Sequence, residues 1–369
     1  MRFQVNNLLV FYMILLGCMF LFNIYYVLWR RFENFDLEYE IKKWRTYLLG
    51  LLEDEAGDGF GTQIMKLKKT SRMEAFNLAV DRMEDEKRRK ILNIIWERRK
   101  EFNVLINEYR QKPAVYKAYM AYFIGKYALL DENPPAVRYI LETVLEPSIY
   151  CRENGLQALY RDGSPGAVIK AFELFSKEQI QHNNKLVTDG LLLYRGNVDE
   201  LAEQIWEQWD EFLDYYKVAF IDFFRMAGCE YGERILSLLK DGTQDRDVRF
   251  ACIRYFRKIK YEPAAETLRT IVRNWTAVDW EFPAVAALSL SNFPGEETRE
   301  VLVDGLCSSN WYIRYNCAET LDTFEDAEKT WDKVRNGNDR YAKEIFAYRR
   351  EASIKARQRA AELEKGEAK

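Results

Sequence analysis

The sequence predicts an all-α protein, an α-solenoid of stacked helical hairpins preceded by one transmembrane helix. Hydrophobic residues make up 48% and aromatic residues 15% of the 369 residues, which is enough to fill a continuous core. The chain has only 18 Gly and 8 Pro, and no long alternating Val, Ile and Thr stretch, which disfavours a many-stranded sheet protein. An apolar pattern that recurs every 30 to 35 residues in the second half then favours a helical-repeat array.

The N-terminal segment from Leu8 to Leu28 contains 21 residues without a charge. A helix of that length spans about 31 Å, which matches the hydrocarbon thickness of a bilayer. Aromatic and basic side chains that favour the membrane interface follow at its end, namely Tyr25, Tyr26, Trp29, Arg30 and Arg31. We therefore expect residues 1–31 to be an uncleaved transmembrane anchor.

Two alternatives for this segment involve processing. A cleaved signal peptide has a shorter apolar core and a small-residue cleavage site, and neither is evident. The tetrapeptide at 15–18, Leu-Leu-Gly-Cys, is similar to a bacterial lipoprotein signal, but the residues after Cys18 stay apolar where a mature lipoprotein turns hydrophilic.

Positive charge follows the anchor and hardly precedes it. Only Arg2 lies before it, whereas five basic residues come soon after it, namely Arg30, Arg31, Lys42, Lys43 and Arg45. Because segments rich in Lys and Arg stay on the inner side, we expect the N-terminus outside the cell membrane and the repeat domain in the cytoplasm. Six cysteines are scattered singly, which agrees with free thiols in a reducing compartment.

Residues 32–112 have the pattern of charged amphipathic helices, which are either degenerate repeats or an N-terminal cap. In the first of them the apolar residues recur every three or four positions, as one helix face requires, at Leu37, Ile41, Trp44, Leu48 and Leu52. A glycine-rich break at 57–61 is expected to connect two helices.

An internal repeat occupies residues 113–337, and a charged helical cap and tail follow at 338–369. Each repeat has an anchor position with small or apolar residues three and four positions later and a large apolar residue seven positions later. The anchors are 35, 30, 32, 34 and 31 residues apart, at Arg152, Val187, Lys217, Arg249, Pro283 and Arg314. A second apolar helix follows each anchor helix. Two helices in so few residues cannot bury both apolar faces alone, so neighbouring repeats must stack.

Three segments, DRDVRFACIRYF (245–256), DWEFPAVAALSL (279–290) and NWYIRYNCAETL (310–321), resemble the short bacterial HEAT repeat. The resemblance covers about 152–321, and Val187 and Pro283 depart from its basic anchor. In that family the arginine of the motif commonly ties adjacent repeats together. The resemblance therefore implies structural roles for Arg152, Arg249 and Arg314.

The sequence offers little chemistry for catalysis. Its single histidine, His182, lies in a polar run between two repeats, and no candidate nucleophile or orienting partner is near it in the sequence. We therefore expect His182 to be a surface loop residue. No metal-binding, phosphate-binding or hydrolase motif is present in the sequence. The chain has a formal net charge of −3, whereas general nucleic-acid binders have an excess of basic residues. We expect no cofactor, no metal, no nucleic acid and no small-molecule substrate.

The segment from Asp199 to Tyr216 is predicted to be one helix with an acidic stripe opposite an apolar face. The stripe contains six carboxylates without an intervening Lys or Arg, namely Glu200, Glu203, Glu207, Asp210, Glu211 and Asp214. Three interpretations stay open: a solvated helix face, a docking strip for a basic partner segment, or a divalent-cation site.

These features predict a membrane-tethered scaffold that binds or organises a membrane complex at the cytoplasmic face, and not an enzyme. Similar anchored bacterial HEAT proteins suggest a polytopic glycosyltransferase or transporter as the partner, by analogy alone. The alternative is a HEAT-type enzyme of the phycobilin-lyase-like or DNA-glycosylase-like class. Glycosylases of this kind use a basic concave face, which the balanced charge disfavours.

Overall fold

The computed structural model describes residues 2–53, 59–325 and 327–367, and every regular element in these ranges is helical. The all-α prediction is confirmed. The chain divides into two compact units, Met1–Asp162 and Gly163–Lys369. This division falls inside the predicted repeat region 113–337, whose boundaries stay a prediction. Residues 57 and 58 of the glycine-rich break at 57–61 lie outside the described residues.

The first unit contains eight α-helices among its described residues. They are α1 (Arg2–Glu53), α2 (Phe60–Ile64), α3 (Thr70–Asp81), α4 (Asp85–Glu97), α5 (Asn103–Tyr109), α6 (Ala114–Lys126), α7 (Pro134–Thr143) and α8 (Ile149–Asp162). The short 3-10 helices Met65–Lys68 and Arg99–Phe102 join them. The C-terminal half of α1 packs on α3 and α4, α6 packs on α8, and α7 covers α8. Aromatic rings fill this core, for example Trp44 on Phe76, with ring centroids 5.1 Å apart.

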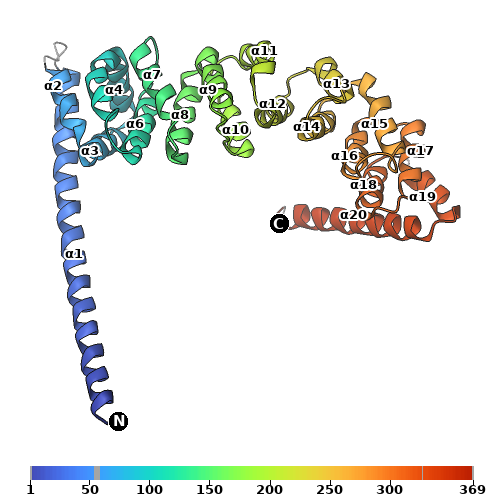
Figure 1. Cartoon of the computed structure of the whole chain (residues 1–369), viewed down its shortest axis with the longest axis horizontal. Helices are drawn as coiled ribbons and strands as arrows, with labels where there is room; N and C mark the ends of the chain where they lie inside the picture. Colours follow the sequence, from blue (N-terminus) through green and yellow to red (C-terminus); the bar gives the residue numbers. More distant parts are fainter. Residues whose placement is uncertain (1, 54–58, 326, 368–369) are drawn as a thin grey trace. The chain divides into compact units, whose positions relative to one another are not determined.

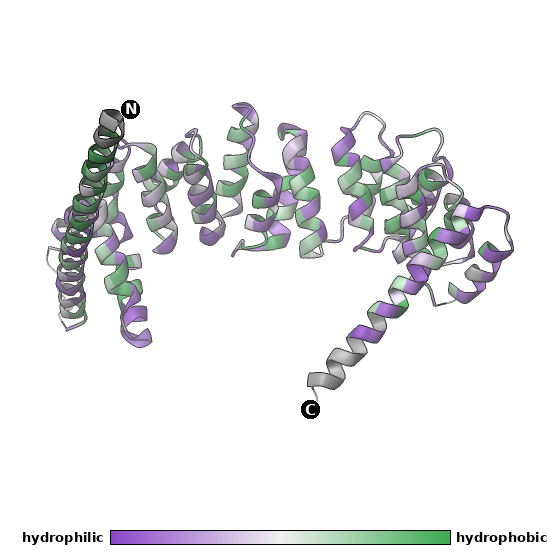
Figure 2. Ribbon diagram, turned by 90° about the horizontal axis from the view of Figure 1, so that it is seen from below, coloured by the Kyte–Doolittle hydropathy of each residue, from purple (hydrophilic) through white to green (hydrophobic). Residues whose placement is uncertain are grey.

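Helix α1 is continuous through the predicted boundary between residues 31 and 32 (Figure 1). Its first half is hydrophobic (Figure 2), and the described side chains from Leu8 to Phe32 are exposed on every side of the helix. Among the described residues it is the one helix long and apolar enough to cross a membrane. A signal sequence near an N-terminus has the same length and composition, so membrane crossing stays a prediction.

The second unit contains twelve α-helices among its described residues. They are α9 (Pro165–Lys177), α10 (Asn184–Leu191), α11 (Val198–Glu207), α12 (Asp214–Ala227), α13 (Gly232–Lys240), α14 (Arg246–Phe256), α15 (Ala265–Arg273), α16 (Glu281–Ser289), α17 (Glu296–Gly305), α18 (Trp311–Asp322), α19 (Ala327–Asn336) and α20 (Arg340–Glu367). Three 3-10 turns, Trp209–Glu211 (η3), Glu262–Ala264 and Leu290–Asn292, interrupt the connections.

The helices of this unit form hairpins that stack in two rows (Figure 1). The even-numbered helices from α10 to α20 pack side by side in chain order, and α13, α15, α17 and α19 each pack on the even-numbered helix that follows. Five predicted anchors lie on α10, α12, α14, α16 and α18, and Arg152 lies on α8. The predicted helical repeat is confirmed, because the 30-to-34-residue spacing from Val187 to Arg314 returns the chain to the same row.

Local signals start several of these helices. The side chains of Asn183, Asn197, Asp245 and Asn310 accept hydrogen bonds from the second and third amides of the helices that follow them. These caps satisfy backbone donors that lack an intrahelical partner. Gly228 directly follows the last residue of α12 and has a φ of 84°, in the left-handed region that favours glycine.

Polar side chains link neighbouring even-numbered helices. Ser289 Oγ on α16 donates to the Ile253 carbonyl on α14 at 2.7 Å, and Thr320 Oγ1 on α18 donates to the Ala287 carbonyl on α16 at 2.8 Å. Both side chains are fully buried or nearly so. A helical carbonyl has a second lone pair, so these bonds connect adjacent repeats without breaking either helix.

Candidate partner-binding surfaces

The anchor arginines contact aromatic rings and backbone in different ways. The Arg249 guanidinium on α14 lies 5.0 Å from the ring centroid of Phe282 on α16, and that of Arg314 lies 4.9 Å from the Tyr341 ring on α20. Both contacts join neighbouring even-numbered helices, as the HEAT resemblance implies. Arg152 instead donates to the Glu146 carbonyl at 3.4 Å, in the turn before its own helix.

The predicted single helix from Asp199 to Tyr216 is wrong. The segment forms α11, the short turn η3 and the start of α12, with Phe212 and Leu213 in extended conformation between them. Burial of aromatic rings causes the break: Trp206 stacks on Trp209 at 4.5 Å, and Phe212 packs on Phe220 at 5.0 Å between ring centroids. Tertiary packing thus overrides the helical periodicity.

The six carboxylates consequently lie on three elements, and all are exposed. Glu200, Glu203 and Glu207 are on α11, Asp210 and Glu211 are on η3, and Asp214 begins α12. Two of them have basic partners that come from outside the predicted stripe: the ion pairs Glu203 with Arg234 and Asp214 with Lys217 have N–O distances of 3.2 and 2.9 Å.

The electrostatics around Glu203 involve a tyrosine as well as Arg234. Burial raises the pKa of the Tyr231 phenol, and its hydrogen bond with Glu203 raises it further. The Arg234 guanidinium lies 5.7 Å from the Tyr231 ring centroid and 5.6 Å from that of Trp206. Glu203 is therefore part of a mixed charged and aromatic cluster, and not of an uncompensated stripe.

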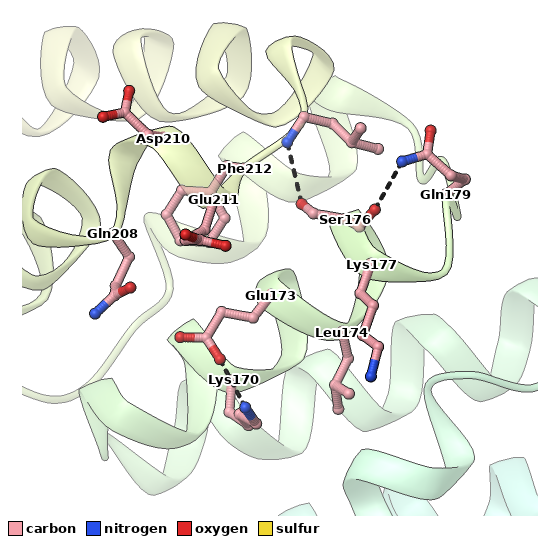
Figure 3. A pocket seen from close by; sticks show the side chains of 11 residues that line it. Lys170, Glu173, Leu174, Ser176, Lys177, Gln179, Gln208, Asp210, Glu211 and Phe212 are labelled. Carbon is pink, nitrogen blue, oxygen red and sulfur yellow. Dashed lines mark hydrogen bonds and ion pairs between the residues drawn. The ribbon is translucent and has the colours of Figure 1, made fainter.

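Asp210 and Glu211 border a polar groove of about 630 Å³ between α9 and η3 (Figure 3). One wall is formed by Lys170, Glu173, Leu174, Ser176 and Lys177, and the other by Gln208, Asp210, Glu211 and Phe212. Ser176 Oγ accepts the Leu213 amide at 3.1 Å, which satisfies a donor freed by the helix break. The groove exposes three carboxylates, and Lys170 neutralises one of them, Glu173, at 2.8 Å.

A second surface consists of aromatic side chains at the starts of α16 and α18. We call Trp280, Trp311, Tyr312 and Tyr315 the aromatic surface. Trp280 stacks on Tyr312 with ring centroids 5.0 Å apart, and Trp311 stacks on Tyr315 at 4.8 Å. Trp280, Trp311 and Tyr312 are 41%, 54% and 54% exposed. Contiguous exposed apolar surface of this kind marks interaction sites.

A positive charge borders the aromatic surface on α20. The Arg349 guanidinium lies 4.7 Å from the Tyr315 ring centroid and also donates to the Tyr315 hydroxyl. Tyr315 is half-buried, so the contact holds the ring in place at the rim of the surface.

The aromatic surface was not predicted, although the sequence contains a signal for it. Trp280 and Trp311 lie three residues before the anchors Pro283 and Arg314, at the same position of two successive repeats. That position lies before the anchor and its apolar residues, next to the start of the helix. A large aromatic residue there has no predicted core contact.

The expected membrane-interface residues lie on α1, and all five, Tyr25, Tyr26, Trp29, Arg30 and Arg31, are exposed. Tyr25 and Trp29 share one side of the helix, with ring centroids 6.0 Å apart. Their membrane contact stays a prediction.

His182 lies in the connection between α9 and α10, as predicted, but it is only 3% exposed, so the expected surface position is wrong. Among the described residues, no group of three or more His, Cys, Asp or Glu side chains is arranged to hold a metal ion.

No protein-family model and no curated protein matches the chain. Human deoxyhypusine hydroxylase, solved in complex with glycerol, is 14% identical over 73% of this chain and 90% of its own, with a TM-score of 0.27. An engineered protein is 14% identical over 86% of this chain and 96% of its own, with a TM-score of 0.35. The stacked hairpins of the chain itself identify it as an all-α helical-repeat protein.

Proposed function

We propose that the chain is a membrane-tethered scaffold whose helical repeats bind another protein at the cytoplasmic face of the membrane. The observation that carries the binding part is the aromatic surface. Trp and Tyr dominate the energetics of protein interfaces because they bury a large area with few rotatable bonds. The stacked pair of Trp280 and Tyr312 and that of Trp311 and Tyr315 are preorganised for such contact.

The exposed apolar half of α1 supports the tethering part. An exposed apolar helix of this length is unfavourable in water, and burial of its side chains in a bilayer removes that cost. Attachment to a membrane also raises the effective concentration of the repeats toward other membrane proteins. A polytopic glycosyltransferase or transporter is the partner class that we propose, by analogy with anchored HEAT proteins.

Recovery of the partner from membranes tests the binding part. The full chain is purified with an affinity tag from detergent-solubilised membranes, and co-purifying proteins are identified by mass. We expect Trp311→Ser/Tyr312→Ser to lower recovery of a specific partner at least tenfold. The matched control Tyr348→Ser changes a tyrosine that is 65% exposed on α20, outside the aromatic surface, and should leave recovery unchanged. Equal recovery with both variants contradicts the proposal.

The exposed carboxylates of α11 and η3 form a second proposed contact, for a basic segment of the same partner. Glu203→Lys/Glu207→Lys/Asp210→Lys should abolish recovery without unfolding the chain, and rising salt should weaken binding of the unmodified chain. The neutral variant Glu203→Gln/Glu207→Gln/Asp210→Asn should give intermediate recovery. If all three proteins recover the partner equally, the carboxylates form only a solvated surface.

Topology tests the tethering part independently. A reporter that is active only in the cytoplasm should function when fused after Lys369, because the basic residues after the apolar segment stay inside. The chain should also remain in the membrane fraction after a high-salt wash. Cleavage of the repeats by protease added to intact cells contradicts this orientation.

A further inference from the structure

Between its apolar half and its packed half, α1 carries a row of exposed aromatic side chains. Phe32, Phe35 and Tyr39 are 78%, 77% and 60% exposed. Their spacings of three and four residues place them on one side of the helix. Ile41 and Trp44, which are buried where α1 packs on α3 and α4, lie on the opposite side at 100° per residue. The folding of the first unit therefore leaves this aromatic row uncovered.

The row continues a repeat that runs along the exposed part of α1. Apolar residues alternate at spacings of three and four from Phe11 to Tyr39, and we call them the α1 seam: Phe11, Ile14, Cys18, Leu21, Tyr25, Leu28, Phe32, Phe35 and Tyr39. Each of these side chains is exposed. A repeat of 3.5 residues is typical of a helix that pairs with another helix in a coiled coil.

The part of the α1 seam after Leu28 gives the strongest evidence for a helical partner. Up to Leu28 the helix is apolar on all sides, so the seven-residue repeat is not distinctive there. From Arg30 onward, polar and charged residues surround Phe32, Phe35 and Tyr39. An exposed apolar stripe on the side of α1 away from its packed face indicates a missing helical partner.

We infer that the α1 seam pairs with the α1 seam of a second copy of this chain, parallel and in register. In a parallel coiled coil, charged residues on either side of the seam meet between the two helices. The residue directly before a seam position in one helix lies near the residue five positions later in the other helix. This geometry pairs Arg31 with Asp36 of the second copy and, with the repeat continued by one position to Lys42, Glu38 with Lys43 of the second copy. Both pairs have opposite charges, and symmetry produces each pair twice.

The present partners of these residues are compatible with the pairing. Among the described side chains, no ion pair involves Arg31 or Asp36, and both are exposed. Glu38 contacts Arg82 at 2.9 Å, and Lys43 lies 4.0 Å from Glu40. The contact between Glu38 and Arg82 joins exposed groups and contributes little, whereas the Glu40 side chain is only 15% exposed. Arg31 and Asp36 thus provide the sharper test.

The parallel direction rests on the proposed membrane attachment, because two copies anchored in one membrane have α1 in the same orientation. The aromatic row at 32–39 lies beyond the apolar segment, so its exposure to water does not depend on that attachment.

Disulfide cross-linking of the full chain in its membrane tests the seam. Two copies of one seam residue face each other in a parallel pair, at the short Cα separation that a disulfide needs. In a Cys18→Ser/Cys307→Ser background, which removes both exposed thiols, Phe35→Cys places a thiol in the seam. Asn34→Cys, the matched control, places an exposed thiol on the other side of the helix. We expect mild oxidation to give at least tenfold more dimer with Phe35→Cys. Equal yields, or no dimer with either, overturn the pairing.

A charge exchange tests the register. With Cys18 retained as the seam thiol in a Cys307→Ser chain, Asp36→Lys places two positive charges together in each pair and should lower dimer formation about fivefold. The double variant Arg31→Glu/Asp36→Lys restores opposite charges and should return dimer formation to within about twofold of the starting level. If the double variant stays as low as Asp36→Lys, the proposed register is wrong.

The same samples separate this inference from the membrane proposal. Each preparation is divided by centrifugation before oxidation, so the fraction that contains the chain is known. Loss of cross-linking while the chain remains in the membrane fraction overturns the pairing alone. Cross-linking of a chain found in the soluble fraction supports the pairing and overturns the membrane attachment.

Discussion

The hydroxyl of Thr320 on α18 donates a hydrogen bond to the carbonyl of Ala287 on α16, 33 residues earlier, at 2.8 Å. Thr320 is 1% exposed and Ala287 is fully buried. The bond aligns one repeat with its neighbour at a defined position along the helix axis. A shift of either helix would leave a buried hydroxyl without a partner, which costs more than the bond itself contributes.

Replacement of Thr320 by valine tests this alignment. Thr320→Val keeps the shape of the side chain but removes the hydroxyl, and we expect a loss of about 1 kcal/mol in the free energy of unfolding. Thr323→Val serves as control, because Thr323 is exposed and bonds only within its own helix, to Thr320 O. Urea unfolding followed by far-UV circular dichroism measures both. Equal losses for the two variants contradict the alignment role.

The repeat core predicts a larger effect at Leu321, which is fully buried on α18. Leu321→Ala should destabilise the protein by about 2–5 kcal/mol, through lost burial and the cavity left behind. Leu193→Ala removes the same atoms at a position that is 61% exposed and should change stability by less than about 0.5 kcal/mol. A neutral Leu321→Ala in thermal unfolding would show that the assigned repeat frame is wrong.

Gly163 precedes α9 with a φ of 80°, and a Cβ there would lie 2.9 Å from the Gly196 amide nitrogen. Gly163→Ala should therefore destabilise the chain by about 1–3 kcal/mol, from left-handed strain and backbone crowding. Gly166, inside α9, has open space around its Cβ direction, so Gly166→Ala should stabilise by about 0.4–1 kcal/mol. Opposite signs of the two shifts in melting temperature are the expected outcome. A harmless Gly163→Ala would contradict the close approach.

Burial raises the pKa of the Cys252 thiol to about 12. In the unfolded chain this thiol has a pKa of about 8.5, so it ionises there first. The thiol therefore contributes its full stability below about pH 8.5, and this contribution is lost as the pH rises toward the folded pKa of about 12.

We expect the free energy of unfolding to fall by up to about 1.4 kcal/mol per pH unit for such a group between pH 9 and 10, before most tyrosines ionise in the unfolded chain. Cys252→Ala should reduce this slope, whereas Cys307→Ala, at an exposed position, should reduce it less. The measurement is urea unfolding at a series of pH values. Identical slopes in all three proteins would show that Cys252 does not cause the pH dependence.

The sequence by itself determined which residues form the even-numbered helices from α10 to α18. The anchors from Val187 to Arg314 were predicted from spacings of three, four and seven, and these spacings are local properties of a helix. Cap residues such as Asn310 and Asp245 are likewise local, because each bonds an amide two or three residues away. The same reasoning located a long apolar helix at the N-terminus.

Only the tertiary structure decided the candidate surfaces. Periodicity extended one helix from Asp199 to Tyr216, but the burial of Trp209 and Phe212 ended it early and divided the acidic stripe. Trp280 and Tyr312 are 32 positions apart, so their stacking depends on how one repeat packs on the next. Spacing along the chain specifies which face of a helix is apolar, whereas the partner that covers that face is set by long-range packing.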